Sequence, residues 1–194
     1  MNAGSKLKGL TRNDKLEHDA WLELVANIRL QTQLGKEDLE QSKEDRIKEL
    51  LKPKNFEKFC RWYFPHYIDS DFGWFHKKAA HKILTSDDVF AVLEWAREHA
   101  KSVFADVFIP MWLKAKGELT GMILASDTEP KAKTLLGDIE AELVGNQRFN
   151  HDFGNQHIQG SHKDGKFTTG DGIGFWSFGI GQDPAGVRKA AKRP

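Results

Sequence analysis

Residues 97–102 of this 194-residue chain, Arg-Glu-His-Ala-Lys-Ser, are the group whose types and spacing best suit chemistry on a phosphate. A lysine followed by a hydroxyl residue at the start of a helix, directly after an apolar segment, is typical of a phosphate-binding turn. Backbone N–H groups and the positive end of the helix dipole would face the anion. Lys101 would reach the outer phosphates of a nucleotide, and the Ser102 hydroxyl would hold Mg²⁺.

The common form of this motif, GxxxxGK[ST], is broken at two positions. Trp95 occupies the position of the first glycine, and Ala100 occupies that of the second. Alanine is small enough for the backbone to approach an anion, although it cannot adopt glycine's positive φ cheaply. Trp95 has to pack against the sheet or stack on another group. The spacing alone therefore favours an ordinary surface connection over a phosphate-binding turn.

The segments around the turn predict a strand–helix–strand–helix order. Val89–Trp95 is short and almost continuously apolar, as expected of a strand covered on both faces. The helix after the turn would be bent at Pro110. A second buried strand at 121–125 feeds a helix from about residue 129 to 144. Short links between such elements indicate parallel pairing in an α/β fold.

Four helices are predicted upstream and a hairpin downstream. Apolar periodicity and breakers place the helices at about 14–34, 36–51, 56–63 and 72–84, the third capped by Asn55. Gly170-Asp171-Gly172 lies between two strands, 167–169 and 175–180, which is a hairpin signal. In the second strand one face is apolar and the other nearly bare; the apolar side chains are Trp176, Phe178 and Ile180.

The amino-acid composition limits the class of protein and the kinds of site that the chain can have. Hydrophobic residues make up 39% of the chain and charged residues 29%, which is typical of a folded domain, and no apolar run suits a membrane span. The net charge of +1 leaves nucleic-acid binding undecided, because a local basic surface can still exist. Cys60 lies among aromatic residues, which favours a buried, inert thiol. The spacing of His151, His157 and His162 matches no metal-ligand pattern.

From about Phe59 onward, the chain resembles the ATPase half of the large terminase subunit of tailed bacteriophages. That family has a deviant phosphate loop with an early arginine and a small residue before the lysine, which residues 96–102 match. Further segments resemble the family in their order and spacing. They are Ile123–Thr128, the following helix to Asn146, His151–Gly154, Gly179–Gln182, Gly186–Arg188 and Arg193-Pro194. The order of these segments over some 130 residues carries the resemblance, and no one of them decides it.

The resemblance implies an ATP-driven motor that moves double-stranded DNA into a procapsid, with a P-loop NTPase-type parallel sheet. The cofactors would be ATP and Mg²⁺. The partners would be DNA, the small terminase subunit, the portal and further copies of the chain. The motor would work in the host cytoplasm, transiently at the portal, without a membrane.

The resemblance also implies roles for individual residues. Residues 97–102 (Arg97, Glu98, His99, Ala100, Lys101, Ser102) would hold the phosphates, with Ser102 on Mg²⁺. Arg97 becomes a candidate arginine finger. A surface arginine paired with Glu94 or Glu98 is the equal alternative. Trp74 and His76 would lie along the adenine, although a packed aromatic helix end is slightly favoured there.

The family pattern is also broken. Ala185 precedes Gly186 where relatives often carry arginine, and the acidic Mg²⁺-binding strand and the water-activating glutamate are expected to follow Pro194.

We therefore predict a helical region at 1–85 and a partial ATPase domain at 86–194. This chain would bind nucleotide weakly at most and show no appreciable hydrolysis. Uncovered strand edges would make it marginally stable or self-associating. A truncated P-loop ATPase of another class, such as a helicase-like one, and a non-catalytic remnant or interaction module remain alternatives.

Overall fold

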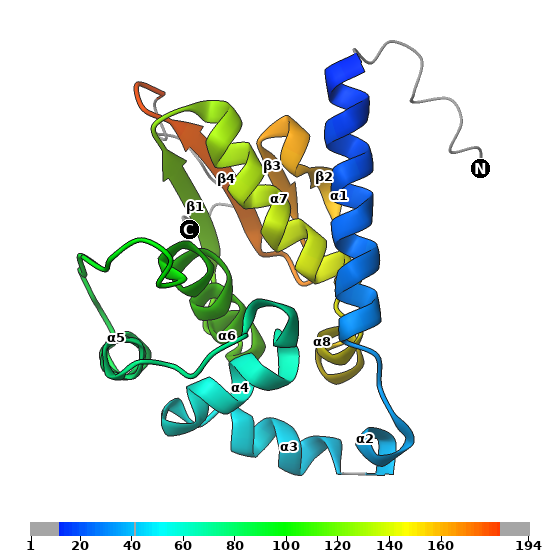
Figure 1. Ribbon diagram of the computed structural model, residues 1–194, viewed down its shortest axis with the longest axis vertical. Helices are drawn as coiled ribbons and strands as arrows, with labels where there is room; N and C mark the ends of the chain where they lie inside the picture. The colour runs from blue at the N-terminus through cyan, green and yellow to red at the C-terminus, as the bar shows by residue number, and fades with distance from the viewer. Residues whose placement is uncertain (1–11, 41, 183–194) are drawn as a thin grey trace.

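Four strands form one mixed sheet in the order β1-β4-β3-β2, with helices flanking it, in the computed structural model, which describes residues 12–40 and 42–182 (Figure 1). β1 (Gly121–Ser126) runs parallel to β4 (Gly174–Gly179). The strand predicted at 121–125 is present, but it is not buried as predicted, because Leu124 is its one buried residue and Ile123 is 42% exposed. β3 (Lys166–Thr168) is antiparallel to both β4 and β2 (Gln159–Ser161). The β3–β4 hairpin is therefore confirmed. The fold is mixed α/β, and the sheet is mixed rather than parallel as predicted.

The buried face of β4 is the one that the sequence pattern left nearly bare. Phe175, Ser177 and Gly179 are buried, Trp176 and Phe178 are half-buried, and Ile180 is 83% exposed. The apolar face of the sequence pattern is therefore not the buried face of the strand. The cause is α7 (Glu129–Gly145), which packs on β4 so closely that a Cβ on Gly179 would lie 2.5 Å from the Glu129 backbone nitrogen. Small side chains on that face are what allow the helix to approach.

The N-terminal region is helical, as predicted, with one helix more than expected. The helices are α1 (Arg12–Gln31), α2 (Lys36–Glu40), α3 (Lys43–Leu50), α4 (Phe56–Tyr63) and α5 (Trp74–Leu84), with short 3₁₀ turns η2 (Pro53–Asn55) and η3 (Pro65–Tyr67). The single helix predicted for 36–51 is divided because the Ser42 hydroxyl caps α3, accepting from the Asp45 N–H at 3.3 Å. Asn55 precedes α4, but its side chain makes no capping hydrogen bond; its amide nitrogen donates to Glu49.

α1 packs along α7 through a small cluster separate from the main core. Val25 and Ile28 of α1 and Ala141 of α7 are its buried members. The Trp21 indole N–H donates to the Gly137 carbonyl at 3.1 Å. Among the described residues, no helix is long and apolar enough to cross a bilayer.

The main core joins the N-terminal helices to the helix that follows the candidate turn. Buried side chains from residues 50–84 and from residues 104–175 belong to one cluster. Within it, Phe56 lies edge-on to Phe104 with ring centroids 5.8 Å apart, and Phe64 stacks on Phe108 at 5.4 Å. Cys60 is fully buried there, so its predicted burial is confirmed, and burial raises its pKa well above the ordinary thiol value, which disfavours the reactive thiolate.

A buried ion pair ties the small helices to this core. The Arg46 guanidinium of α3 contacts Asp152 of α8 (Gln147–Phe153) at 2.6 Å, and the Tyr63 hydroxyl donates to the same carboxylate at 2.7 Å. Although burial opposes ionisation, these hydrogen bonds hold the pKa of Asp152 below its ordinary value.

The helix after the turn is continuous from residue 101 to 116 but widens in the middle. Its central part, η4 (Val103–Phe108), is a π-helix, and α6 (Ile109–Lys116) follows. Pro110 cannot donate to the carbonyl of residue 106 and its ring crowds that carbonyl, which favours the wider turns before it. The bend expected at Pro110 stays a prediction. At the far end, Lys114 is buried and pairs at 2.6 Å with Asp171 in the turn between β3 and β4.

Two carboxylates repel each other between η4 and α7. Burial raises the pKa of Asp106 to about 6, with a further contribution from Asp138. Burial, with repulsion from Glu142, likewise raises the pKa of Asp138 to about 6. In the unfolded chain both groups titrate near 3.8. The native state therefore holds these protons more tightly, and the two aspartates cost stability as pH rises from about 4 to about 7.

We predict that the double substitution Asp106→Asn and Asp138→Asn stabilises the chain at pH 7.5 and has little effect at pH 4. The gain at pH 7.5 should be about 1–3 kcal/mol, after allowing for partial solvent screening. Denaturant unfolding of both proteins at the two pH values measures the difference. The exposed Asp87→Asn serves as control, and an equal gain at both pH values would contradict the electrostatic explanation.

Candidate phosphate-binding turn

The segment before the turn is extended but is not a strand of the sheet, so that prediction was wrong. Residues 89–96 have no strand assignment and make no backbone hydrogen bonds with the described residues. Phe90 is 94% and Val92 70% exposed, while Leu93 and Trp95 turn inward. An apolar run becomes a buried strand only where a neighbouring strand pairs with it. Within the described part of the chain, β1 is already paired with β4 and no strand lies beside 89–96.

The backbone of the turn has an unusual conformation. Glu98 has φ 67° and Ala100 φ 50°, both in the left-handed region that favours glycine. Ala100 thus adopts the conformation that the motif's second glycine provides, at the cost of some strain. The N–H groups of residues 97–100 donate to no described residue, and these residues are exposed. Unpaired N–H groups in such a turn, directly before a helix, form a concave surface suited to an anion.

Two histidines support the turn from its carbonyl side. The Gly73 N–H donates to Nδ1 of His76 at 3.1 Å, so His76 carries its proton on Nε2. Nε2 then donates to the His99 carbonyl at 3.0 Å. His99 in turn bonds the Arg97 carbonyl through Nδ1 at 2.9 Å. Side chains therefore occupy the carbonyls of Arg97 and His99, while the N–H groups of residues 97–100 stay available.

The charged residues of the turn are exposed. Lys101 and Ser102 are the first two residues of the helix, as predicted. Arg97 and Lys101 form no ion pair with any residue that the structure describes. The alternative in which Arg97 pairs with Glu94 or Glu98 is therefore not seen. Both cations can reach a bound anion without first breaking a contact.

Trp95, at the position of the missing first glycine, anchors the turn. Its ring packs against three others, with centroid distances of 4.7 Å to His76, 5.0 Å to Phe104 and 5.1 Å to Phe75. These residues come from α5 and from the helix after the turn. The tryptophan thus joins the candidate site to one aromatic cluster through edge-to-face contacts, rather than by stacking or by packing against the sheet.

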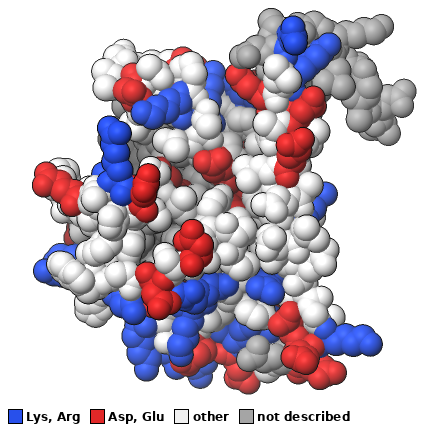
Figure 2. All heavy atoms as spheres, viewed as in Figure 1, with Lys and Arg blue, Asp and Glu red and all other residues white. Residues whose placement is uncertain are grey.

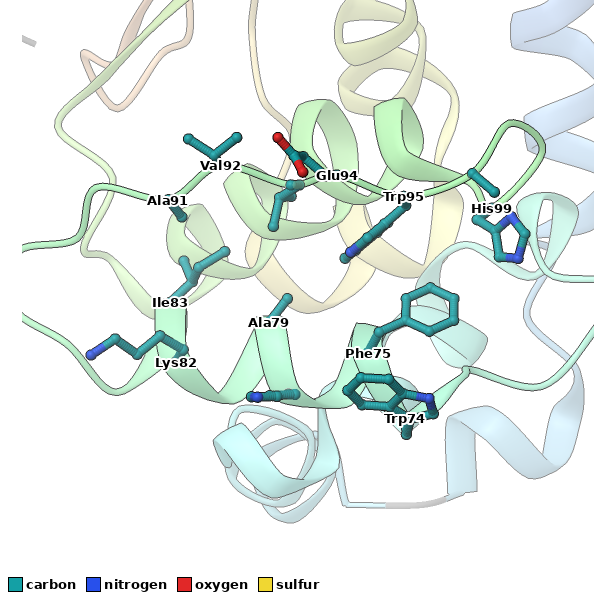
Figure 3. Close-up of a pocket in the computed structure, with 13 residues that line it drawn as sticks. Trp74, Phe75, Ala79, Lys82, Ile83, Ala91, Val92, Glu94, Trp95 and His99 are labelled. Atoms are coloured by element: carbon teal, nitrogen blue, oxygen red, sulfur yellow. The ribbon is translucent and has the colours of Figure 1, made fainter.

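An open cavity of about 530 Å³ lies between α5 and the extended segment, beside the turn (Figure 3). Trp74, Phe75, Trp95 and His99 contribute aromatic rings, and Ile83 and Leu93 contribute aliphatic surface. Trp74 is 74% exposed. A cavity with aromatic surfaces next to free N–H groups and cations can accept a planar ring that carries phosphates.

The structure brings most of the predicted site residues together. Arg97 to Ser102 form the turn and helix start, and Trp74 and His76 lie next to them on α5. One ring nitrogen of His76 accepts from the Gly73 N–H at the start of α5 and the other donates to the His99 carbonyl, so its observed contacts are with the protein backbone. Sequence reasoning missed Lys78 and Lys82, which line the same cavity. Lys78 and Lys82 follow Trp74 by one and two helical turns, and this spacing could have placed them on the same helix face from the sequence alone.

Other candidate residues lie elsewhere. The Asp127 carboxylate at the end of β1 accepts from the Ser126 hydroxyl at 2.9 Å and from the Thr128 N–H at 3.1 Å. His151 and His162 pair with separate carboxylates, Asp152 and Glu140. The remaining family-like segments, Ala185–Arg188 and Arg193-Pro194, lie outside the described residues.

Comparison with known proteins assigns the chain to no family. The chain matches no protein-family model, no curated protein and no solved structure.

The strained turn gives a stability prediction. Ala100→Gly should stabilise the chain by up to about 1 kcal/mol, because glycine adopts a φ near 50° without the Cβ penalty that alanine incurs. Ala105→Gly, in the same helix, is a matched control and should destabilise by about 1 kcal/mol. Chemical denaturation of the three proteins measures both changes. Loss of stability in Ala100→Gly would show that the turn is not strained as described.

Proposed function

We propose that residues 97–102 bind the phosphates of ATP, and that the chain is the N-terminal part of a DNA-packaging motor of the terminase large-subunit kind. The observation that carries nucleotide binding is the turn itself. Its N–H groups are unpaired, Glu98 and Ala100 have positive φ, and the helix that follows begins with Lys101 and Ser102. This combination favours an anion-binding turn over the ordinary surface connection that the spacing alone suggested.

In this proposal each residue has a defined task. The N–H groups of the turn and the helix dipole hold the phosphate oxygens, and the Lys101 ammonium neutralises the β- and γ-phosphates. The Ser102 hydroxyl ligates Mg²⁺. Arg97 is exposed and unpaired, and it stabilises the charge that develops on the transferred phosphoryl group. The adenine occupies the adjacent cavity, against Trp74 and Phe75.

The packaging role rests on the family resemblance of the motifs. Coupling to double-stranded DNA, the small subunit and the portal belongs to that part of the proposal. A helicase-like P-loop ATPase would share the nucleotide site, and the sequence encoded beyond Pro194 distinguishes the two. An apolar strand ending in two acidic residues, followed much later by a cluster of nuclease carboxylates, supports the terminase.

A second candidate function is that of an interaction module. Phe90 and Val92 are exposed on an extended segment whose backbone groups are unpaired. Such an edge can pair with a strand of a partner chain. A module of this kind does not need nucleotide, so nucleotide binding separates the two functions.

We predict that the chain binds a fluorescent ATP analogue in the presence of Mg²⁺, and that Lys101→Ala weakens this binding at least about tenfold. The lost ammonium removes a charge-assisted contact with the phosphates, worth about 1.5–3 kcal/mol. Fluorescence anisotropy titration measures the dissociation constants.

Lys116→Ala, at the other end of the same helix, is the matched control and should bind like the unmodified chain. Equal binding by Lys101→Ala and the unmodified chain would contradict the assignment of residues 97–102 as a phosphate site. Absence of binding in every protein would favour the interaction module instead.

A further inference from the structure

A second cavity, of about 800 Å³, lies between α1 and α7. The two helices run side by side, touch in their second halves through Val25, Ile28 and Ala141, and separate toward their first turns (Figure 1). The short helix η5 (His162–Asp164) packs against α7 beside them. The cavity has no lining residue in common with the one beside the turn at 97–102, so it is a separate candidate site.

Apolar side chains form part of the cavity wall. They are Ala20, Trp21 and Leu24 of α1 and Pro130 of α7. The Trp21 ring is fixed, because its indole N–H is bonded to the Gly137 carbonyl and its centroid lies 5.6 Å from that of the His162 ring. Trp21 and Leu24 are each partly exposed. A ligand that covered them would bury apolar surface against a wall that is already formed.

α7 contributes to the cavity a carboxylate that has no hydrogen-bond donor. Asp138 lines the cavity and is only partly exposed. Among the described residues, nothing donates to its oxygens or forms an ion pair with it. A carboxylate removed from water ordinarily accepts from several N–H or O–H groups, and leaving it without them is costly. Asp138 therefore has acceptor capacity that a ligand can use.

The charged groups around Asp138 leave its charge uncompensated. Asp106 of η4 and Glu142 of α7 both repel it, and His162 acts in the opposite direction. Nδ1 of His162, however, donates to the Glu140 carboxylate at 2.7 Å, and the backbone N–H of the same residue donates to it at 2.6 Å. His162 is thus already balanced by Glu140, and its Nε2 is a further acceptor when the ring is neutral.

The lining of the cavity carries more negative than positive charge. The carboxylates are Glu17, Glu129 and Asp138, and the ammonium groups are Lys133 and Lys163. Lys133 is paired with Glu129 at 2.6 Å. In the space-filling view, acidic side chains lie on α1 and on α7 next to it (Figure 2). A cation is therefore the complementary ligand.

We propose that this cavity binds a primary ammonium ion carried on an apolar chain, with the ammonium at Asp138 and the chain along Trp21 and Leu24. An ammonium supplies three N–H donors and the positive charge that Asp138 lacks. A metal ion is less suitable, because the described residues contain no group of three His, Cys, Asp or Glu side chains that could hold one. The proposal does not depend on nucleotide binding. The same ammonium chemistry occurs in free amines and in the lysine side chains of proteins.

The test is a ¹H–¹⁵N NMR titration of the chain with n-hexylammonium chloride at pH 7.5. We expect saturable shifts at the cavity, including the indole N–H of Trp21 and the amide of Gly137, with a dissociation constant of about 1 mM. n-Butylammonium should bind at least about fivefold more weakly, because its shorter chain covers less apolar surface. 1-Hexanol has the same chain without the charge and should bind at least about tenfold more weakly. Equal binding by 1-hexanol would overturn the ammonium assignment, and absence of these shifts would overturn the cavity as a site.

Asp138→Asn should weaken n-hexylammonium binding at least about tenfold, since the amide keeps the shape of the side chain but lacks its charge. The matched control is Asp106→Asn, which makes the same change in net charge beside Asp138 but outside the cavity lining. It should bind n-hexylammonium at least as well as the unmodified chain, because it removes a charge that hinders ionisation of Asp138. Melting temperatures check that both variants fold. Unchanged affinity in Asp138→Asn, or an equal loss in Asp106→Asn, would overturn the proposal.

A short peptide distinguishes the two sources of the ammonium group. Acetyl-Leu-Lys-Leu-amide presents a lysine between apolar side chains. Tighter binding of this peptide than of n-hexylammonium, lost in Asp138→Asn, supports the proposal and identifies a protein partner as the source. Weaker binding of the peptide supports the proposal with a free amine as the ligand. Peptide binding that survives Asp138→Asn would overturn the role of Asp138.

Discussion

The packing of α4 aromatic rings on the helix after the turn is the contact on which the rest of the structure depends. Phe104 and Phe108 are fully or almost fully buried against Phe56 and Phe64, and large apolar side chains of this kind dominate core energetics. This contact fixes where the helix begins and therefore where the exposed turn stands. Trp95 extends the same cluster to the start of the turn. The candidate site is thus held by helix packing rather than by the sheet.

That arrangement explains how an unpaired segment can carry an ordered turn. A phosphate-binding turn ordinarily gains its rigidity from a strand before it and a helix after it. Here residues 89–96 lack the strand pairing, and the hydrogen bond from His76 to the His99 carbonyl provides support from α5 instead. The backbone strain at Glu98 and Ala100 persists because the groups on both sides are fixed.

The charge distribution follows the same division of the molecule. Buried charges are paired across elements, as Arg46 is with Asp152 and Lys114 with Asp171, and they join distant parts of the chain. The lysines of η2, α4 and α5 are left in solvent, on the outer sides of the helices that bury the aromatic core. The helices that hold the turn in place therefore also present the cations.

The sequence by itself determined the helices at 56–63 and 129–144, the strand at 121–125 and the hairpin, because periodicity and turn residues are local signals. It also determined that Lys101 and Ser102 begin a helix. Only the tertiary structure decided that Val89–Trp95 is not a strand, since an apolar run does not reveal whether a partner lies beside it. The tertiary structure also decided which face of β4 is buried, because α7 approaches the side that carries glycine. It likewise decided the contact of His76 with the turn, which joins residues 23 positions apart. Long-range contacts choose among conformations that the local sequence permits.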